Sequence, residues 1–314
     1  MTALHKSSGA LNVTAAKRRF FKREDIPLYA MALPGALALI IFAYLPMMGL
    51  LIAFQDFNVS KGVFGSAFVG MSNFRFLFST TDAFTITRNT VLYNLAFIVV
   101  NTTVAVVLAL MLSELLSSKT AKTLQTIYML PYFLSWAVVA IVLLGFIERD
   151  YGMVNRMLGG KVDYYRRREL WPGLLVFVNC WKNVGYSTVL YLAVISGISH
   201  DYYEAAALDG ATKFQQARFI TIPHLRFILG VSLIMAMGNI FRGDFGLFYV
   251  VTRNTGRLYP VTDVIDTYIY RGLTSLGNVG MATAAGLYQS AVGFILVLAV
   301  NAAVTKIDPE SAMF

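Results

Sequence analysis

Residues 91–115 read VLYNLAFIVVNTTVAVVLALMLSEL, and Glu114 is the single charged residue in this run. The hydrocarbon core of a bilayer is roughly 30 Å thick, so an α-helix needs about 20 predominantly apolar residues to cross it. Only 14% of the 314 residues are charged, against about 25% in a typical soluble domain. The run therefore predicts a transmembrane helix in an integral membrane protein.

Five further segments pass the same test. The six predicted spans cover residues 29–53, 91–115, 126–147, 174–198, 225–251 and 282–304. They predict an all-α integral membrane fold with six transmembrane helices, in one domain over residues 29–304. Residues 1–28 form a basic N-terminal tail and residues 305–314 a C-terminal tail.

The basic residues favour a lipid partner over nucleic acid. The net charge is +9, but the basic residues are scattered among loops and form no long stripe, so we expect no nucleic-acid partner. The densest cluster precedes the first span, where it would touch anionic lipid headgroups on the cytoplasmic side. This cluster is Lys17, Arg18, Arg19, Lys22 and Arg23. It predicts that both tails, and the loops after the second and fourth spans, are cytoplasmic.

The loop between the fourth and fifth spans, residues 199–223, contains two short helix patterns. Asp201 followed by Glu204 is a capping pattern, and Gly210 supplies a stop. A second cap starts at Thr212, and Pro223 is expected to end that second helix and to open the fifth span. A helix as short as 202–209 is not stable alone, so it must rest on the protein's own membrane ends or on a partner.

The pattern Glu204-Ala-Ala-x-x-Asp-Gly210-Ala, followed by Pro223, resembles the EAA loop of binding-protein-dependent ABC importer permeases. The chain is most similar to the maltose-type permeases, in the branch for oligosaccharide and polysaccharide uptake. That similarity rests also on Trp181-Lys-x-x-Gly185 and on segments 263–273 (DVIDTYIYRGL) and 286–290 (GLYQS).

The resemblance implies a subunit of an ATP-driven importer in the bacterial inner membrane. Its expected partners are a second, related permease, two cytoplasmic ATPases that hold ATP and magnesium, and an extracytoplasmic solute-binding protein. The short helix would insert into an ATPase as a coupling helix. The residues that the resemblance assigns to coupling are Tyr203, Glu204, Ala205, Ala206, Asp209, Gly210 and Pro223.

Polar and ionisable residues within or near the spans are candidates for the translocation path, since such groups at membrane depth usually face a protein or water-filled interior. The candidates are Lys182, Tyr186, Asn239, Arg242 and Asp244. A purely structural alternative exists for two of them. Arg242 would reach the membrane surface, and Lys182 would pair with a helix carbonyl or a carboxylate.

No catalytic or cofactor pattern accompanies these features in the sequence. The nearest match to a phosphate-binding loop, from Gly65 to Gly70, lacks the lysine. His5, His200 and His224 have no metal-ligand spacing, and Cys180 is the only cysteine. We therefore expect a non-catalytic subunit that binds no cofactor. A secondary transporter, or a permease for peptides or polyamines, is the alternative.

The loop between the third and fourth spans carries a basic excess on the predicted external side. Its basic residues are Arg149, Arg156, Lys161, Arg166, Arg167 and Arg168, and its acidic residues are Glu148, Asp150, Asp163 and Glu169. One hypothesis is that the loop attracts an anionic oligosaccharide such as a uronate oligomer, or docks an acidic face of the binding protein. The alternative is a solvated loop with internal ion pairs.

Overall fold

The computed structural model describes residues 26–75, 79–115, 118–160 and 162–307. The chain divides into two compact units, Met1–Gly49 and Leu50–Phe314, and each is considered by itself. The basic cluster of the N-terminal tail and residues 308–314 of the C-terminal tail lie outside the described residues.

The described part of the first unit is helical. α1 (Ile26–Leu39) continues through a π-helical turn, Ile40–Tyr44, into α2 (Leu45–Met47). The wider turn comes directly before Pro46, and the Leu45 N–H donates to the Ile40 carbonyl five residues back. Proline has no N–H to donate to the carbonyl four residues back, so the helix accommodates it by widening.

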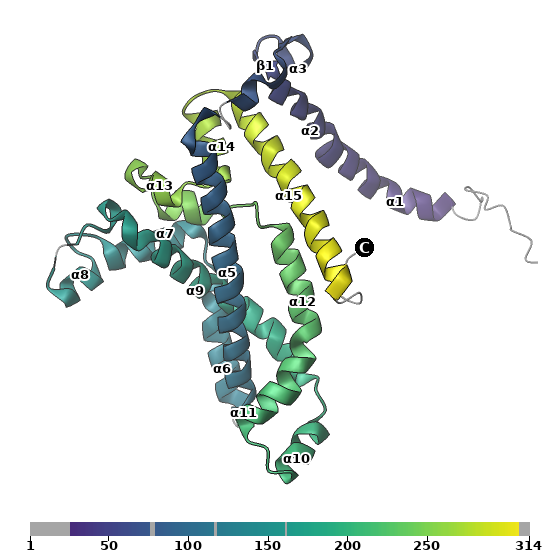
Figure 1. The fold of residues 1–314 in the computed structure, drawn as a ribbon, viewed down its shortest axis with the longest axis vertical. Coiled ribbons are helices and arrows are strands. Elements are labelled where there is room, and N and C mark those ends of the chain that lie inside the picture. Colours follow the sequence, from purple (N-terminus) through teal and green to yellow (C-terminus); the bar gives the residue numbers. More distant parts are fainter. Residues whose placement is uncertain (1–25, 76–78, 116–117, 161, 308–314) are drawn as a thin grey trace, which may run out of the picture. The chain divides into compact units, whose positions relative to one another are not determined.

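The second unit contains the remaining elements (Figure 1). In chain order the main ones are β1 (Gln55–Asp56), α3 (Gly62–Gly65), β2 (Ala67–Phe68), α5 (Thr81–Ser113), α6 (Ser118–Met129), α7 (Trp136–Ile147), α8 (Met153–Leu158), α9 (Trp171–Ser196), α10 (His200–Leu208), α11 (Lys213–Gln216), α12 (Ile222–Gly238), α13 (Tyr259–Thr262), α14 (Ile265–Thr274) and α15 (Val279–Ile307). The two strands form one short antiparallel pair.

α5 and α9 are the central helix pair of this unit. One core cluster joins them to α7 and to the π-helical segment Gly246–Val251, around the fully buried Trp171. A second cluster joins them to α12, around Leu225. α15 packs on α12 and α14, and α10 lies at the end of the unit opposite α14 (Figure 1).

Four helical stretches of the described residues are long and apolar enough to cross a membrane. These are Ile26–Phe54, Thr81–Ser113, Lys213–Gly238 and Val279–Ala302. The bent pair Lys119–Phe133 and Trp136–Ile147 would make a fifth span. α9 is 26 residues long but is not among them, because polar residues interrupt its apolar sequence. The number of six spans stays a prediction.

Two of the predicted spans are not continuous helices. The third, expected over residues 126–147, bends by 103°, because Leu134 adopts an extended conformation and Ser135 caps a new helix through the Val138 amide. The fifth, expected over residues 225–251, is broken between Gly238 and Gly246. There the Asp244 carboxylate accepts from the amides of Gly246 and Leu247 and favours a fresh helix start.

The loop at residues 199–223 contains one short helix, α10, and the start of a second, long helix, and two expectations need correction. The cap of α10 is Ser199, whose hydroxyl accepts the Asp201 amide, and not Asp201 itself. The expectation that Pro223 ends the second helix is wrong, because helix continues from Lys213 to Gly238. A π-helical turn, Ala217–Thr221, precedes Pro223 and lets the helix continue through it, as the turn Ile40–Tyr44 does before Pro46. The Gly210 stop, with φ +80°, and the Thr212 capping box are confirmed.

Candidate functional site

A cavity of about 700 Å³, lined by both polar and apolar side chains, lies between α5, α9, α12 and the break in the fifth predicted span. We call it the central cavity. Four of the five residues predicted for the translocation path line it: Tyr186, Asn239, Arg242 and Asp244. Residues far apart in the sequence thus meet at one site. Non-helical backbone at membrane depth is tolerated where it lines a water-filled cavity or is buried in protein, so the position of the break is consistent with such a cavity.

Five asparagine side chains contribute to the polar wall of the central cavity. They come from two helices, α5 and α9, and from the break: Asn94, Asn101, Asn179, Asn183 and Asn239. The amide of Asn101 donates to Asn179 across the α5–α9 contact at 2.9 Å. Amides offer both hydrogen-bond donors and acceptors, so this wall can bind neutral polar groups such as hydroxyls. Only Asn239 was singled out from sequence, although amides within otherwise apolar spans were a signal that pointed to the others.

Lys182 is buried beside the central cavity and does not line it. Its ammonium donates to the carbonyls of Leu134 at 2.6 Å and Tyr132 at 2.9 Å, and weakly to Pro131 at 3.4 Å. It also lies 5.2 Å from the ring centre of Trp136. These carbonyls lie at the bend of the third span, where helical bonds are missing. The structural alternative for Lys182, pairing with helix carbonyls, is therefore the one observed.

Gly185 brings α9 against the same bend. A Cβ atom at this position would lie 2.0 Å from the Tyr128 carbonyl oxygen, closer than any side chain allows. The Trp181-Lys-x-x-Gly185 element thus builds a helix junction. The junction also reaches the central cavity. Tyr132, just beyond α6, stacks on the cavity-lining Tyr186 with ring centres 4.9 Å apart.

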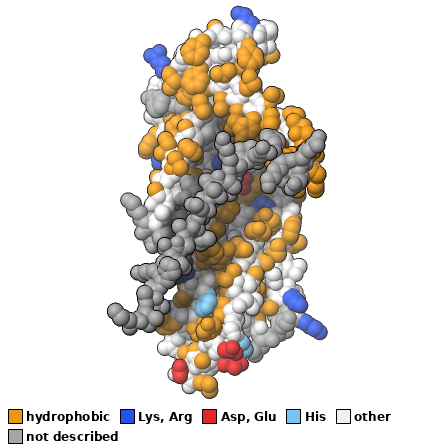
Figure 2. Space-filling view, turned by 90° about the vertical axis from the view of Figure 1, so that its right-hand side faces the viewer, with side chains coloured by type: hydrophobic (Ala, Val, Ile, Leu, Met, Phe, Trp, Pro, Cys, Tyr) orange, Lys and Arg blue, Asp and Glu red, His pale blue; other side chains and the backbone are white. Residues whose placement is uncertain are grey.

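The coupling candidates lie on α10 and the turn after it. Glu204, Ala205, Asp209 and Gly210 are exposed, and acidic side chains are visible at this end of the molecule in Figure 2. Tyr203 is half-buried, and its hydroxyl lies 3.0 Å from the Thr221 hydroxyl. α10 is thereby tied directly to the Lys213–Gly238 span, which contains Thr221.

The remaining coupling candidates differ in exposure. Ala206 is half-buried and Pro223 is exposed. Two apolar side chains near Gly210, which the sequence reasoning did not single out, are strongly exposed: Leu208 at 91% and Phe214 at 75%. Large apolar side chains in such positions are typical of surfaces that contact another molecule.

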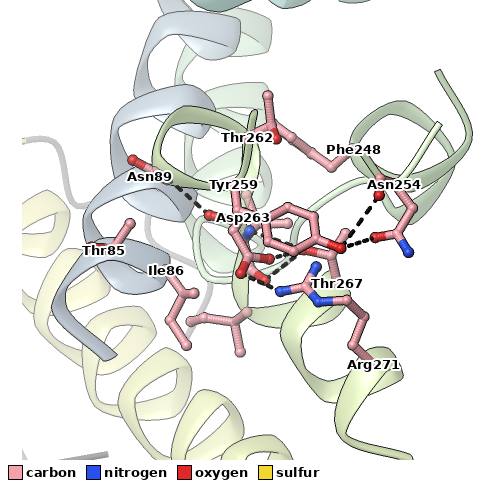
Figure 3. Close-up of polar contacts among 12 residues, drawn as sticks. Thr85, Ile86, Asn89, Phe248, Asn254, Tyr259, Thr262, Asp263, Thr267 and Arg271 are labelled. Carbon is pink, nitrogen blue, oxygen red and sulfur yellow. Dashed lines mark hydrogen bonds and ion pairs between the residues drawn. The ribbon is translucent and has the colours of Figure 1, made fainter. Parts of the chain in front are cut away.

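The segment between residues 252 and 278 is braced by a buried polar cluster (Figure 3). The Arg271 guanidinium pairs with the Asp263 carboxylate and lies 4.0 Å from the ring centre of Tyr259. The Tyr259 hydroxyl donates to Asn254, and the Asn89 amide of α5 donates to the Asp263 carbonyl at 3.0 Å. The cluster fixes the start of α14 against α5.

The basic loop of residues 148–170 is partly neutralised by its own acids. Arg166 pairs with Asp163 at 3.0 Å, and Arg168 approaches Glu169 at 3.7 Å. The Asp150 amide donates to the exposed Glu148 carboxylate and lowers its pKa below the ordinary value. Lys161 lies outside the described residues. Within the described ranges, no three or more His, Cys, Asp or Glu residues are grouped as a metal ion would require.

A family model for the inner membrane component of binding-protein-dependent transport systems matches residues 103–309. The chain belongs to this family. The resemblance to ABC importer permeases is therefore confirmed, and with it a multi-pass protein of the inner membrane. The homologous proteins are ABC transporter permease subunits.

Two relatives of this permease are informative. The polygalacturonan/rhamnogalacturonan transport system permease protein YteP of Bacillus subtilis is 32% identical over 287 residues, which cover 90% of this chain and 89% of YteP.

A crystal structure of a bacterial ABC transporter involved in the import of the acidic polysaccharide alginate has a chain with TM-score 0.82 and 31% identity to this permease. That match covers 91% of this permease and 97% of the other chain. A second structure of the alginate transporter, at the same TM-score and identity, contains an alginate pentasaccharide-bound periplasmic protein, and its match covers 90% of this permease and 96% of that chain.

Proposed function

We propose that this permease forms half of the translocation pathway of an ATP-driven importer for an oligosaccharide. The central cavity carries the proposal, because its amide-lined wall offers hydrogen bonds at membrane depth that an apolar helix surface does not. The relatives support a saccharide cargo over a peptide or a polyamine, since they are named for transport of polygalacturonan, rhamnogalacturonan and alginate. Membership of a binding-protein-dependent family argues against a secondary transporter.

The proposed cargo is anionic, such as a uronate oligomer. Arg242 is the exposed cation of the cavity lining, and the other polar groups there are neutral amides and hydroxyls, apart from the Asp244 carboxylate, which accepts from the amides of Gly246 and Leu247. A guanidinium matches the planar geometry of a carboxylate and can bind it through two parallel hydrogen bonds. The alginate transporter supports this cargo class by its described substrate, an acidic polysaccharide. Some arginines of the 148–170 loop, such as Arg149, would add attraction at long range.

Coupling to ATP hydrolysis is proposed to run through α10. Its exposed Glu204 and Gly210, together with Leu208 and Phe214, form a surface that a cytoplasmic ATPase would cover. The Tyr203–Thr221 contact would transmit a displacement of α10 into the Lys213–Gly238 span, which reaches the central cavity. A packed, rigid element is suited to pass such a movement on.

The partners proposed for the permease are a second, related permease, two ATPases that bind ATP and magnesium, and an extracytoplasmic solute-binding protein. The alginate transporter structure with its bound periplasmic protein supports the last of these. This arrangement puts both termini and α10 on the cytoplasmic side.

Uptake by the complete importer tests the proposal. The permease is co-expressed with its genomic neighbours, purified as a complex and reconstituted into proteoliposomes that contain ATP. Labelled uronic-acid and neutral oligosaccharides of equal length are then supplied with the binding protein. We expect ATP-dependent uptake with preference for the uronate. Preference for the neutral sugar would contradict the anionic cargo, and ion-driven uptake by the permease alone would contradict the importer.

A further inference from the structure

The break at residues 239–245 exposes backbone groups that neighbouring side chains then satisfy. The Asn94 amide of α5 donates to the carbonyls of Ile240 and Arg242, both at 3.0 Å. The Gln289 amide of α15 donates to the Phe241 carbonyl at 2.6 Å. Three consecutive carbonyls, each without a helical partner here, are thus held from two sides.

The amide side of the break is held as firmly as the carbonyl side. The Gly243 N–H donates to the Asp266 carboxylate of α14 at 2.5 Å, and the same oxygen accepts from Gln289 at 3.1 Å. A Cβ atom on Gly243 would lie 2.7 Å from Val264 Cγ2 and 3.0 Å from that Asp266 oxygen. Only glycine permits this approach, so the backbone next to Arg242 packs directly against the start of α14.

α14 is itself fixed, so Asp266 has a rigid base. The Asp263–Arg271 pair and the Thr267 hydroxyl, which donates to Asp263 at 2.6 Å, brace its first turns (Figure 3). The Ile265 amide donates to the Thr90 hydroxyl of α5 at 3.1 Å. The two C-terminal segments that carried the resemblance, residues 263–273 and 286–290, therefore converge on the break, one through Asp266 and one through Gln289.

We propose that Asp266 and Gln289 are positioning residues that set the direction of Arg242 in the central cavity. The inference rests on the proposed function, in which Arg242 binds a carboxylate of the cargo. Arg242 is exposed and lines the central cavity, so the position of its guanidinium depends on where the backbone of residues 240–243 is held. The proposed effect runs through the hydrogen bonds of the two side chains to the Gly243 N–H and the Phe241 carbonyl.

Cysteine labelling tests the clamp without any cargo. Arg242→Cys is made in a Cys180→Ser background of the complete importer, and its reaction rate with a water-soluble methanethiosulfonate is measured. Adding Asp266→Ala or Gln289→Ala should change the rate at least about fivefold, because the backbone of residue 242 is freed. Asp266→Asn keeps an acceptor oxygen for Gly243 and should restore the parent rate. An unchanged rate in both alanine variants would overturn the proposal.

The ratio of uronate uptake to neutral-oligosaccharide uptake is a second readout, because partial unfolding would lower both rates without changing their ratio. In proteoliposomes, Asp266→Ala should lower uptake of the uronate relative to a neutral oligosaccharide roughly tenfold, on the scale of one hydrogen bond to a charged group. Asp266→Asn should stay close to wild type. Ser290→Ala is the matched control, because the Ser290 hydroxyl donates only to Gly286 of its own helix.

The outcomes separate the two claims. Equal loss in Asp266→Asn and Asp266→Ala would mean that the charge matters and would overturn positioning by hydrogen bonds. If the wild-type importer shows no preference for uronates, the proposed cargo fails, while the labelling rates still decide whether Asp266 and Gln289 hold residue 242.

Discussion

Replacing Lys182 with methionine removes the ammonium group that donates hydrogen bonds to the backbone carbonyls at the bend of the third span. Methionine has a similar length and no charge, so the change keeps most of the packing and deletes the donor. Three carbonyls lose it: Leu134 at 2.6 Å, Tyr132 at 2.9 Å and Pro131 at 3.4 Å. The last is too long to contribute much.

The expected loss follows from the two short bonds. A hydrogen bond from a charged donor contributes about 1.5–3 kcal/mol, which gives roughly 3–6 kcal/mol for the pair. Methionine also avoids the cost of burying an ammonium, which offsets part of this loss. Within membranes, polar contacts between helices average nearer 0.6 kcal/mol, because partners are also found in the unfolded state. We therefore expect a loss of about 2–3 kcal/mol in the free energy of unfolding.

The assay is equilibrium unfolding of the purified permease in mixed detergent micelles. Lys122→Met is the control, since Lys122 is an exposed lysine of α6 and should change stability by less than about 0.5 kcal/mol. Uronate selectivity per folded Lys182→Met complex should match wild type, because Lys182 does not line the central cavity. A stability equal to that of the Lys122 variant, or altered selectivity, would refute the structural role.

Three further substitutions test the helix junction and α10. Gly185→Ala should lower the free energy of unfolding by more than about 2 kcal/mol, the scale of core overpacking, because the added Cβ would lie 2.0 Å from the Tyr128 carbonyl oxygen. Gly145→Ala is the matched control in the same unfolding assay, since a Cβ there would have nothing within 4 Å. Gly210→Ala forces a residue with a Cβ atom into φ +80° and should destabilise the turn after α10 by about 1–2 kcal/mol. The variant should insert into the membrane normally but take up less oligosaccharide per ATP hydrolysed. Glu204→Ala should reduce ATP hydrolysis stimulated by the loaded binding protein, and unaltered stimulation would remove Glu204 from the coupling surface.

The sequence was informative where structure is decided locally. Apolar runs predicted the helices because a span needs little more than length and hydrophobicity. Gly210 and the Thr212 capping box were predictable for the same reason, since a cap depends on residues three or four apart. The family resemblance rested on such a local pattern as well.

The break in the fifth span was only partly predictable from its own residues. Gly243 and Asp244 are local signals for a helix end and a fresh start, but the groups that replace the missing helical bonds come from α5, α14 and α15. Lys182 shows the same limit. Its position within a span predicted that the charge would need a partner. The partner itself was not predictable, because the acceptor carbonyls of Tyr132 and Leu134 lie about fifty residues earlier in the chain. Such pairings depend on tertiary packing.

Blocking the central cavity tests the account most directly. Ser232 of α12 lines that cavity, so Ser232→Trp places a large ring in the space proposed for the sugar. Ser196→Trp, at an exposed position at the end of α9 outside the lining, is the matched control. In proteoliposomes with ATP and binding protein, we predict that the Ser232 variant assembles but takes up no oligosaccharide, while the Ser196 variant transports normally. Uptake through the Ser232 variant at the wild-type rate would contradict the assignment of this cavity as the translocation pathway.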